Sequence, residues 1–90
     1  MLDRILVIIP TYNEATNLPL IVPQVLKQDS RIEVLVVDDN SPDGTGDIVD
    51  RMAQSELRIH ALHRQAKEGL GRAYLAGFKW GLGHHFDAMF

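Results

Sequence analysis

Residues 34–45 read VLVVDDNSPDGT, and this stretch decides the fold. Four apolar residues in a row, followed at once by a turn-rich segment, are typical of a strand that is buried on both faces of a parallel sheet. Open α/β sheets bind ligands beyond the carboxyl ends of their strands, so we expect Asp38 and Asp39 to lie at a binding edge. The alternative is that these carboxylates only cap the next helix, which would need one acceptor rather than two.

Length and composition describe one small domain with no internal boundary. The chain has 90 residues, of which 46% are hydrophobic and 23% charged, as in ordinary globular proteins. A formal net charge of −3 argues against a nucleic-acid-binding protein. The sequence has no cysteine, no apolar run of the ~20 residues that span a bilayer, and no signal-peptide pattern. We therefore expect a cytoplasmic location.

Predicted strands and helices alternate along the chain. Apolar runs predict strands over residues 5–9 and 34–37, residues 58–63 read as a more polar strand at the sheet edge, and residues 86–90 look like the opening of a fourth strand. Helical spacing predicts helices over residues 18–26, 45–53 and 70–82. This alternation predicts an α/β fold, a doubly wound parallel sheet with flanking helices. We expect Pro10 to end the first strand, Pro23 to bend the first helix or delay its start, and Thr45 to cap the second helix.

The third predicted helix is apolar nearly all round. Its two apolar faces are formed by Leu70, Ala73, Tyr74, Gly77, Trp80 and Gly81, and by Leu75, Phe78 and Leu82. A helix of this kind is normally buried on both sides, and the few elements of this chain are not enough to cover it. We therefore expect residues 1–90 to be the N-terminal part of a longer domain, and we expect the isolated chain to self-associate.

Most sequence motifs that indicate a cofactor or metal are absent. The segment GLGRAY at residues 69–74 has a tyrosine where a dinucleotide fingerprint has its third glycine, and it follows the third strand rather than the first. The four histidines have neither a ligand spacing nor a carboxylate cluster beside them, so we expect no metal site among them.

Polar and aromatic residues follow three of the predicted strands and suit a nucleotide. Tyr12 could stack on a base, and the carboxylates of Glu14 and Asp39 could accept hydrogen bonds from base N–H groups or ribose hydroxyls. Arg64 and Lys67 could contact phosphate. The alternatives are ordinary partial burial for Tyr12 and a solvated loop for the two cations.

These residues resemble a known family. The segments PTYNE (residues 10–14) and NLP (residues 17–19) look like the opening of the family-2 inverting glycosyltransferases of GT-A type. The segments VDDNSPDGT (residues 37–45) and GLGRAYLAG (residues 69–77) are narrower, and resemble the polyprenol (dolichol) phosphate mannosyltransferases. The resemblance covers essentially the whole chain.

The resemblance implies transfer of mannose from GDP-mannose to a polyprenyl phosphate at the cytoplasmic face of the membrane, with a membrane-anchoring partner or domain. It places the GDP-mannose contacts on Pro10, Tyr12, Glu14, Val37 and Asp39, with Asp38 as support and Arg64 and Lys67 less securely in the family's basic loop. The family's Asp-x-Asp motif, which holds Mg²⁺ or Mn²⁺, is expected beyond Phe90, as are the acceptor-binding residues. Residues 1–90 would then hold no metal and no catalytic residue, and would not turn over alone.

Two other functions remain open at this point. One is a related transferase with another donor, such as UDP-glucose, and the other is a non-catalytic nucleotide-binding or interaction module. A metal-binding Asp-x-Asp shortly after residue 90 would favour an enzyme over the non-catalytic module.

Overall fold

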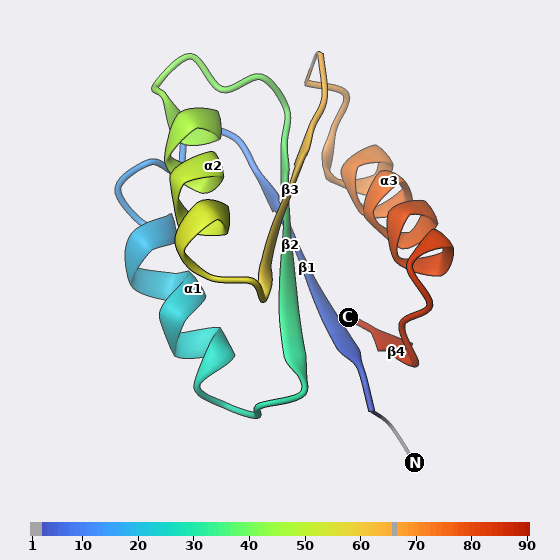
Figure 1. Ribbon diagram of the computed structural model, residues 1–90. Coiled ribbons are helices and arrows are strands. Elements are labelled where there is room, and N and C mark those ends of the chain that lie inside the picture. The colour runs from blue at the N-terminus through green and yellow to red at the C-terminus, as the bar shows by residue number, and fades with distance from the viewer. Residues whose placement is uncertain (1–2, 66) are drawn as a thin grey trace.

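The computed structural model describes residues 3–65 and 67–90, and it alternates strands with helices throughout (Figure 1). The elements in chain order are β1 (Ile5–Thr11), α1 (Leu18–Leu26), β2 (Ile32–Asp38), α2 (Thr45–Ser55), β3 (Ile59–His63), α3 (Leu70–Gly83) and β4 (Ala88–Met89). Each predicted element is present. Most of the strands and helices begin or end within a few residues of the predicted bounds.

The four strands form one parallel sheet in the order β3-β2-β1-β4. Helices α1 and α2 cover one face and α3 covers the other, as Figure 1 shows. From β1 the chain adds β2 and then β3 on one side, and β4 on the other side of β1. This order confirms the doubly wound arrangement. Because β2 lies between β1 and β3 and has helices on both faces, the side chains of Val34, Leu35, Val36 and Val37 are all 0% exposed.

The pleat of β2 divides the hydrophobic core into two halves. Val34 and Val36 face α1 and α2, where they pack with Leu18, Val22 and Val49. Leu35 and Val37 face α3, where they pack with Leu6, Ile8 and Ala73. Successive side chains of a strand point to opposite faces, so the same alternation continues into the two aspartates that follow.

One prediction about a proline was wrong, and one of the two alternatives for another is excluded. The first strand does not end at Pro10: it continues to Thr11. The N–H of Ile8 donates to the carbonyl of Phe90 at 2.7 Å, and Pro10, two residues on, faces the same side beyond the end of β4. In the described part of the chain no strand lies on that side to accept a hydrogen bond, so a proline is tolerated. Helix α1 begins at Leu18 with Pro23 inside it, so of the two expectations for Pro23, a bend or a late start of the helix, the late start is wrong.

The expected cap of α2 is one residue out of place. Gly44 is the N-cap, with φ of 87°, and Thr45 is the first residue of the helix. A positive φ favours glycine because other residues carry a Cβ that is crowded in this conformation. Thr45 is therefore free for another role, and its side chain is 0% exposed.

Helix α3 packs its small residues against the sheet. Ala73, Gly77 and Gly81 are buried, and a Cβ added at Gly77 would lie 2.6 Å from Cγ2 of Ile8. On the outer side, Leu75 is 60% exposed and Leu82 is 67% exposed. The apolar outer face is therefore uncovered in the part of the chain that the structure describes. Within residues 3–65 and 67–90, no helix has the length and apolar character that crossing a membrane requires.

Candidate functional site

The carboxyl ends of β1, β2 and β3 lie at the same edge of the sheet. Thr11 pairs with Asp38, and Asp38 pairs with His63, so the three strands end side by side. The loops that follow therefore start at one rim, as predicted from the parallel order.

A hollow with a volume of about 60 Å³ opens at this rim on the α3 side of the sheet. It is lined by Pro10, Thr11, Tyr12, Asp39, Lys67, Gly69, Leu70 and Ala73. The ammonium nitrogen of Lys67 lies 4.5 Å from the centre of the Tyr12 ring, a cation–π distance. Pockets that enclose a whole small molecule have about 300–1,000 Å³, so this hollow has room for part of a ligand.

Buried polar atoms without hydrogen-bond partners gather beside this hollow. Among the described residues, these side-chain atoms are Oγ1 of Thr11, Oδ1 of Asp39 and Nη1 of Arg64. Thr11 and Asp39 are each only 5% exposed. An unsatisfied buried polar group costs about 1–3 kcal/mol, so a ligand with matching polar groups would be bound favourably here.

Asp38 faces the other side of the sheet and has a structural task. It is 3% exposed, and its carboxylate accepts hydrogen bonds from the backbone N–H and the hydroxyl of Ser41. A second, polar hollow of about 300 Å³ lies on this α2 side, where Asp50 bonds His63 at 2.7 Å. Of its acidic residues Asp38, Asp47 and Asp50, two already have partners: Asp38 bonds Ser41 and Asp50 bonds His63. On the α3 side, Oδ1 of Asp39 has no hydrogen bond, and Tyr12 and Lys67 line the same hollow. We therefore place the candidate site on the α3 side.

Three side chains, two from the β2–α2 loop and one from the first residue of α2, hold the loop that follows β1. Ser41 Oγ accepts from the N–H of Asn13 at 2.9 Å, Thr45 Oγ1 from Glu14 at 3.1 Å, and Asp43 Oδ2 from Ala15 at 3.2 Å. We call Ser41, Asp43 and Thr45 the loop clamp. The hydrogen bond from the Thr45 hydroxyl is the largest influence on Asp43 and lowers the pKa of its carboxyl.

The loop clamp was missed by the reasoning from sequence. The sequence does contain serine, aspartate and threonine at alternate positions 41, 43 and 45, and side chains of these types accept hydrogen bonds from backbone N–H groups. The sequence does not show which segment of the backbone these side chains would bind. In the structure it is the loop that carries Tyr12, so the clamp positions one wall of the hollow.

Four of the sequence-predicted residues meet at the α3-side hollow, and the others lie elsewhere. Pro10, Tyr12, Asp39 and Lys67 line it. The Glu14 carboxylate does not: it accepts from the Asn17 amide at 2.8 Å and lines a separate hollow beside α1. The chain turns at Asn13, where φ is 57°, and this turn separates Glu14 from Tyr12.

Val37 and Arg64 differ from the expectation for a direct ligand contact. The Val37 side chain is completely buried against α3, so only its backbone could contact a ligand. Arg64 was named with Lys67 as a residue that could contact phosphate, and its guanidinium lies 3.4 Å from Asp39 and 3.1 Å from Glu68. Its side chain is 16% exposed, which also contradicts the solvated loop as far as Arg64 is concerned.

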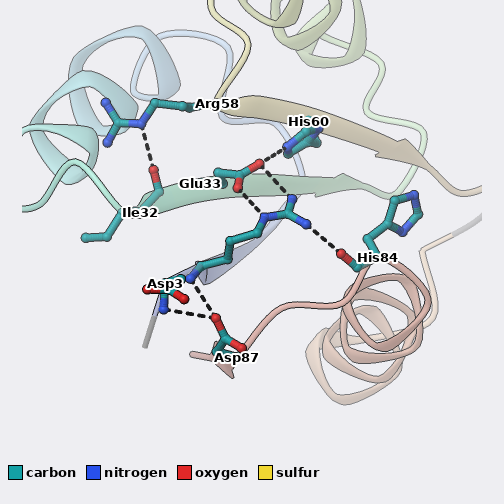
Figure 2. Close-up of polar contacts among 8 residues, drawn as sticks. Asp3, Ile32, Glu33, Arg58, His60, His84 and Asp87 are labelled. Carbon is teal, nitrogen blue, oxygen red and sulfur yellow. Dashed lines mark hydrogen bonds and ion pairs between the residues drawn. The ribbon is translucent and has the colours of Figure 1, made fainter. Parts of the chain in front are cut away.

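A second polar cluster lies near the amino ends of the strands, away from the candidate site (Figure 2). Glu33 bonds Arg4 at 3.0 Å and His60 at 2.8 Å. Burial raises the pKa of the Glu33 carboxyl, but the hydrogen bonds from Arg4 and His60 outweigh this, and the net pKa is below its usual value. These partnered groups tie β1, β2 and β3 together.

No group of three His, Asp or Glu side chains within residues 3–65 and 67–90 lies where it could hold a metal ion. Asp87, the acid nearest the end of the chain, instead accepts hydrogen bonds from the backbone N–H groups of Asp3 and Arg4, at 3.0 and 2.8 Å.

Comparison with known proteins gives consistent matches. The model of the family "Glycosyl transferase family 2" matches residues 6–86. The chain is 54% identical over 88 residues to a polyprenol monophosphomannose synthase of Mycolicibacterium smegmatis, covering 97% of this chain and 33% of that protein. It is 51% identical over 86 residues to an undecaprenyl-phosphate mannosyltransferase of Micrococcus luteus, covering 96% of this chain and 35% of that protein. The chain thus spans about a third of the length of these curated relatives.

A solved structure shares the fold. It is the mannosyltransferase PcManGT from Pyrobaculum calidifontis, in complex with GDP-Man and Mn²⁺. The TM-score is 0.78 at 29% sequence identity, and the match covers 89% of this chain and 25% of that one.

Proposed function

Because this chain belongs to glycosyl transferase family 2, we propose that it forms the nucleoside-binding part of an enzyme that transfers mannose from GDP-mannose to a polyprenyl phosphate. The observation that carries the proposal is the α3-side hollow, in which an aromatic ring, a cation and a buried carboxylate with an oxygen that makes no hydrogen bond meet. The names of the two relatives support the polyprenyl phosphate acceptor, and the GDP-Man complex supports the donor.

The residues of the hollow have complementary roles in this proposal. The Tyr12 ring, with Lys67 above it, offers a face on which a base can stack. Asp39 can accept hydrogen bonds from the N–H groups on the edge of guanine, whose exocyclic amino group is a donor. Pro10 contributes the wall beside the strand end, and the backbone of Val37 lies behind it.

A divalent metal belongs to the proposal, although the described residues do not form a site for one. The solved neighbour is bound to Mn²⁺, and we propose Mg²⁺ or Mn²⁺ for this enzyme. Such an ion, when bound, neutralises charge on the departing diphosphate. We therefore propose that the metal ligands, and the residues that bind the acceptor, lie outside residues 1–90.

The acceptor also suggests where the enzyme works. A polyprenyl chain resides in the membrane, and we propose that the protein acts at the cytoplasmic face with an anchoring partner or domain. Fractionation of cells expressing the complete protein would test this proposal, since recovery only in the soluble fraction would contradict it.

The donor is tested by calorimetric titration of the complete protein with GDP and with UDP, and by transfer of radiolabelled sugar from GDP-mannose or UDP-glucose to polyprenyl phosphate. We expect GDP to bind more tightly and mannose to be transferred. Transfer from UDP-glucose instead would establish the related transferase, and nucleotide binding without transfer would establish a non-catalytic module.

A matched pair of tyrosine variants tests the site. Tyr12→Ala is expected to weaken GDP about 5- to 100-fold, because base–aromatic stacking is worth about 1–3 kcal/mol. Tyr74→Ala is the control. Tyr74 lies on α3 and is 39% exposed, close to the 36% of Tyr12, but it does not line the hollow. Equal GDP affinity in the two variants would contradict this site.

A further inference from the structure

We propose that Arg64 is a positioning residue for Asp39, which it holds in place for the nucleobase, and that it does not contact the donor's phosphates. This inference rests on the proposed function, because it assigns Asp39 to the base. It replaces the phosphate role that the sequence suggested for Arg64.

The backbone brings Arg64 to Asp39 from the neighbouring strand. The N–H of Arg64 donates to the carbonyl of Asp38 at 2.8 Å, which continues the β2–β3 pairing by one residue beyond β3. The side chain then lies beside Asp39, with Nη1 3.4 Å from Oδ1. Asp39 is anchored in turn, since its N–H donates to the carbonyl of Thr11 at 3.3 Å.

Burial explains why Asp39 requires this cation. The Asp39 side chain is only 6% exposed, and a carboxylate removed from water is costly unless a positive charge lies beside it. Arg64 is itself 16% exposed and is held from its other side by Glu68 at 3.1 Å. The guanidinium therefore lies between two carboxylates, which limits its movement toward a phosphate.

The pair leaves hydrogen-bonding capacity unused. Oδ1 of Asp39 and Nη1 of Arg64 have no hydrogen-bond partner among the described residues, despite their proximity. An ionised carboxylate has about four acceptor sites, so a base N–H can bind while Arg64 still supplies the charge. Asp39 lines the α3-side hollow and Arg64 does not; Arg64 lines the polar hollow on the α2 side instead.

Guanosine and GDP distinguish a positioning role from a phosphate contact. In the complete protein, Arg64→Met should weaken both ligands by the same factor, about 10- to 100-fold, since a hydrogen bond to a charged group is worth about 1.5–3 kcal/mol. Arg64→Lys keeps the charge and should recover part of this loss for both ligands. Arg72→Met is the control: Arg72 also contacts Glu68, at 3.5 Å, but is 72% exposed, and its removal should change neither affinity.

A double variant tests whether Arg64 acts through Asp39. In the Asp39→Asn background, Arg64→Met should cause no further loss, because the group that it positions has been changed. The inference is overturned if Arg64→Met weakens GDP but not guanosine, if its effect multiplies with that of Asp39→Asn, or if it has no effect. Should Arg64→Met not fold, equal guanosine affinity in Arg64→Lys and Arg72→Met would overturn it. Failure of the unmodified protein to bind either ligand would instead refute the proposed function itself.

Discussion

Removal of the Thr45 hydroxyl should loosen one wall of the proposed nucleotide site without changing its shape. Thr45→Val keeps the volume of a side chain that is 0% exposed, but it removes the oxygen that accepts from the Glu14 N–H at 3.1 Å. The same hydroxyl donates to Asp43, so the loop clamp loses two of its contacts. Thr45→Ser is the matched variant, because it keeps the hydroxyl and removes only a methyl group.

The expected magnitude follows from the unpaired N–H. Leaving a buried donor unsatisfied costs about 1–3 kcal/mol, and Glu14 is only partly buried, so we expect about 1–2 kcal/mol for Thr45→Val. Thr45→Ser should also lose stability, about 1 kcal/mol, for the missing buried methyl group. Stability alone therefore does not separate the two variants, but the state of the Glu14 amide does.

Amide hydrogen exchange and GDP titration provide the test. In Thr45→Val, the Glu14 amide should exchange about 5- to 30-fold faster, which corresponds to 1–2 kcal/mol, and GDP should bind more weakly. In Thr45→Ser, both quantities should stay near those of the unmodified protein. If the two variants have the same exchange rate at Glu14 and the same GDP affinity, the hydroxyl is not what holds the loop.

Three further predictions concern packing, charge and the outer face of α3. Gly77→Ala should destabilise the protein by about 1–2 kcal/mol in urea unfolding, because its Cβ would lie 2.6 Å from Ile8 and the overlap exceeds the gain in helix propensity. Gly71→Ala, with nothing within 4 Å, should be neutral or stabilising, and the reverse order would contradict the packing. Glu33→Gln should lower the free energy of unfolding at neutral pH but not at acid pH. The pKa of Glu33 is depressed in the folded protein, so the stability that its carboxylate contributes is lost as the pH falls below about 4.5. Parallel curves of stability against pH for the variant and the unmodified protein would refute this. Self-association of the isolated chain should be seen by light scattering and reduced by Leu75→Glu, whereas a monomer at all concentrations would contradict it.

The sheet and most of its core could be predicted from the order of residues. An unbroken apolar run such as 34–37 has few alternatives to a central strand, because each side chain must be buried on one face or the other. The alternation of strands and helices then leaves a parallel, doubly wound sheet as the natural topology. The continuation of β1 through Pro10 was not predictable in the same way. A proline is tolerated in a strand only where no neighbouring strand lies on the side to which its backbone nitrogen points, and the sequence does not show where the neighbours end.

The candidate site was determined by the sequence in part. Three residues that line the candidate site, Tyr12, Asp39 and Lys67, could be named because they follow strands whose carboxyl ends must meet at one rim. Only the tertiary structure decided which face of the sheet each side chain occupies. It directs Asp39 toward α3 and Asp38 toward α2, and it turns Glu14 away at Asn13. The pairing of Arg64 with Asp39 likewise depends on the distance between two loops that lie far apart in the chain, and residue types alone do not specify such a distance.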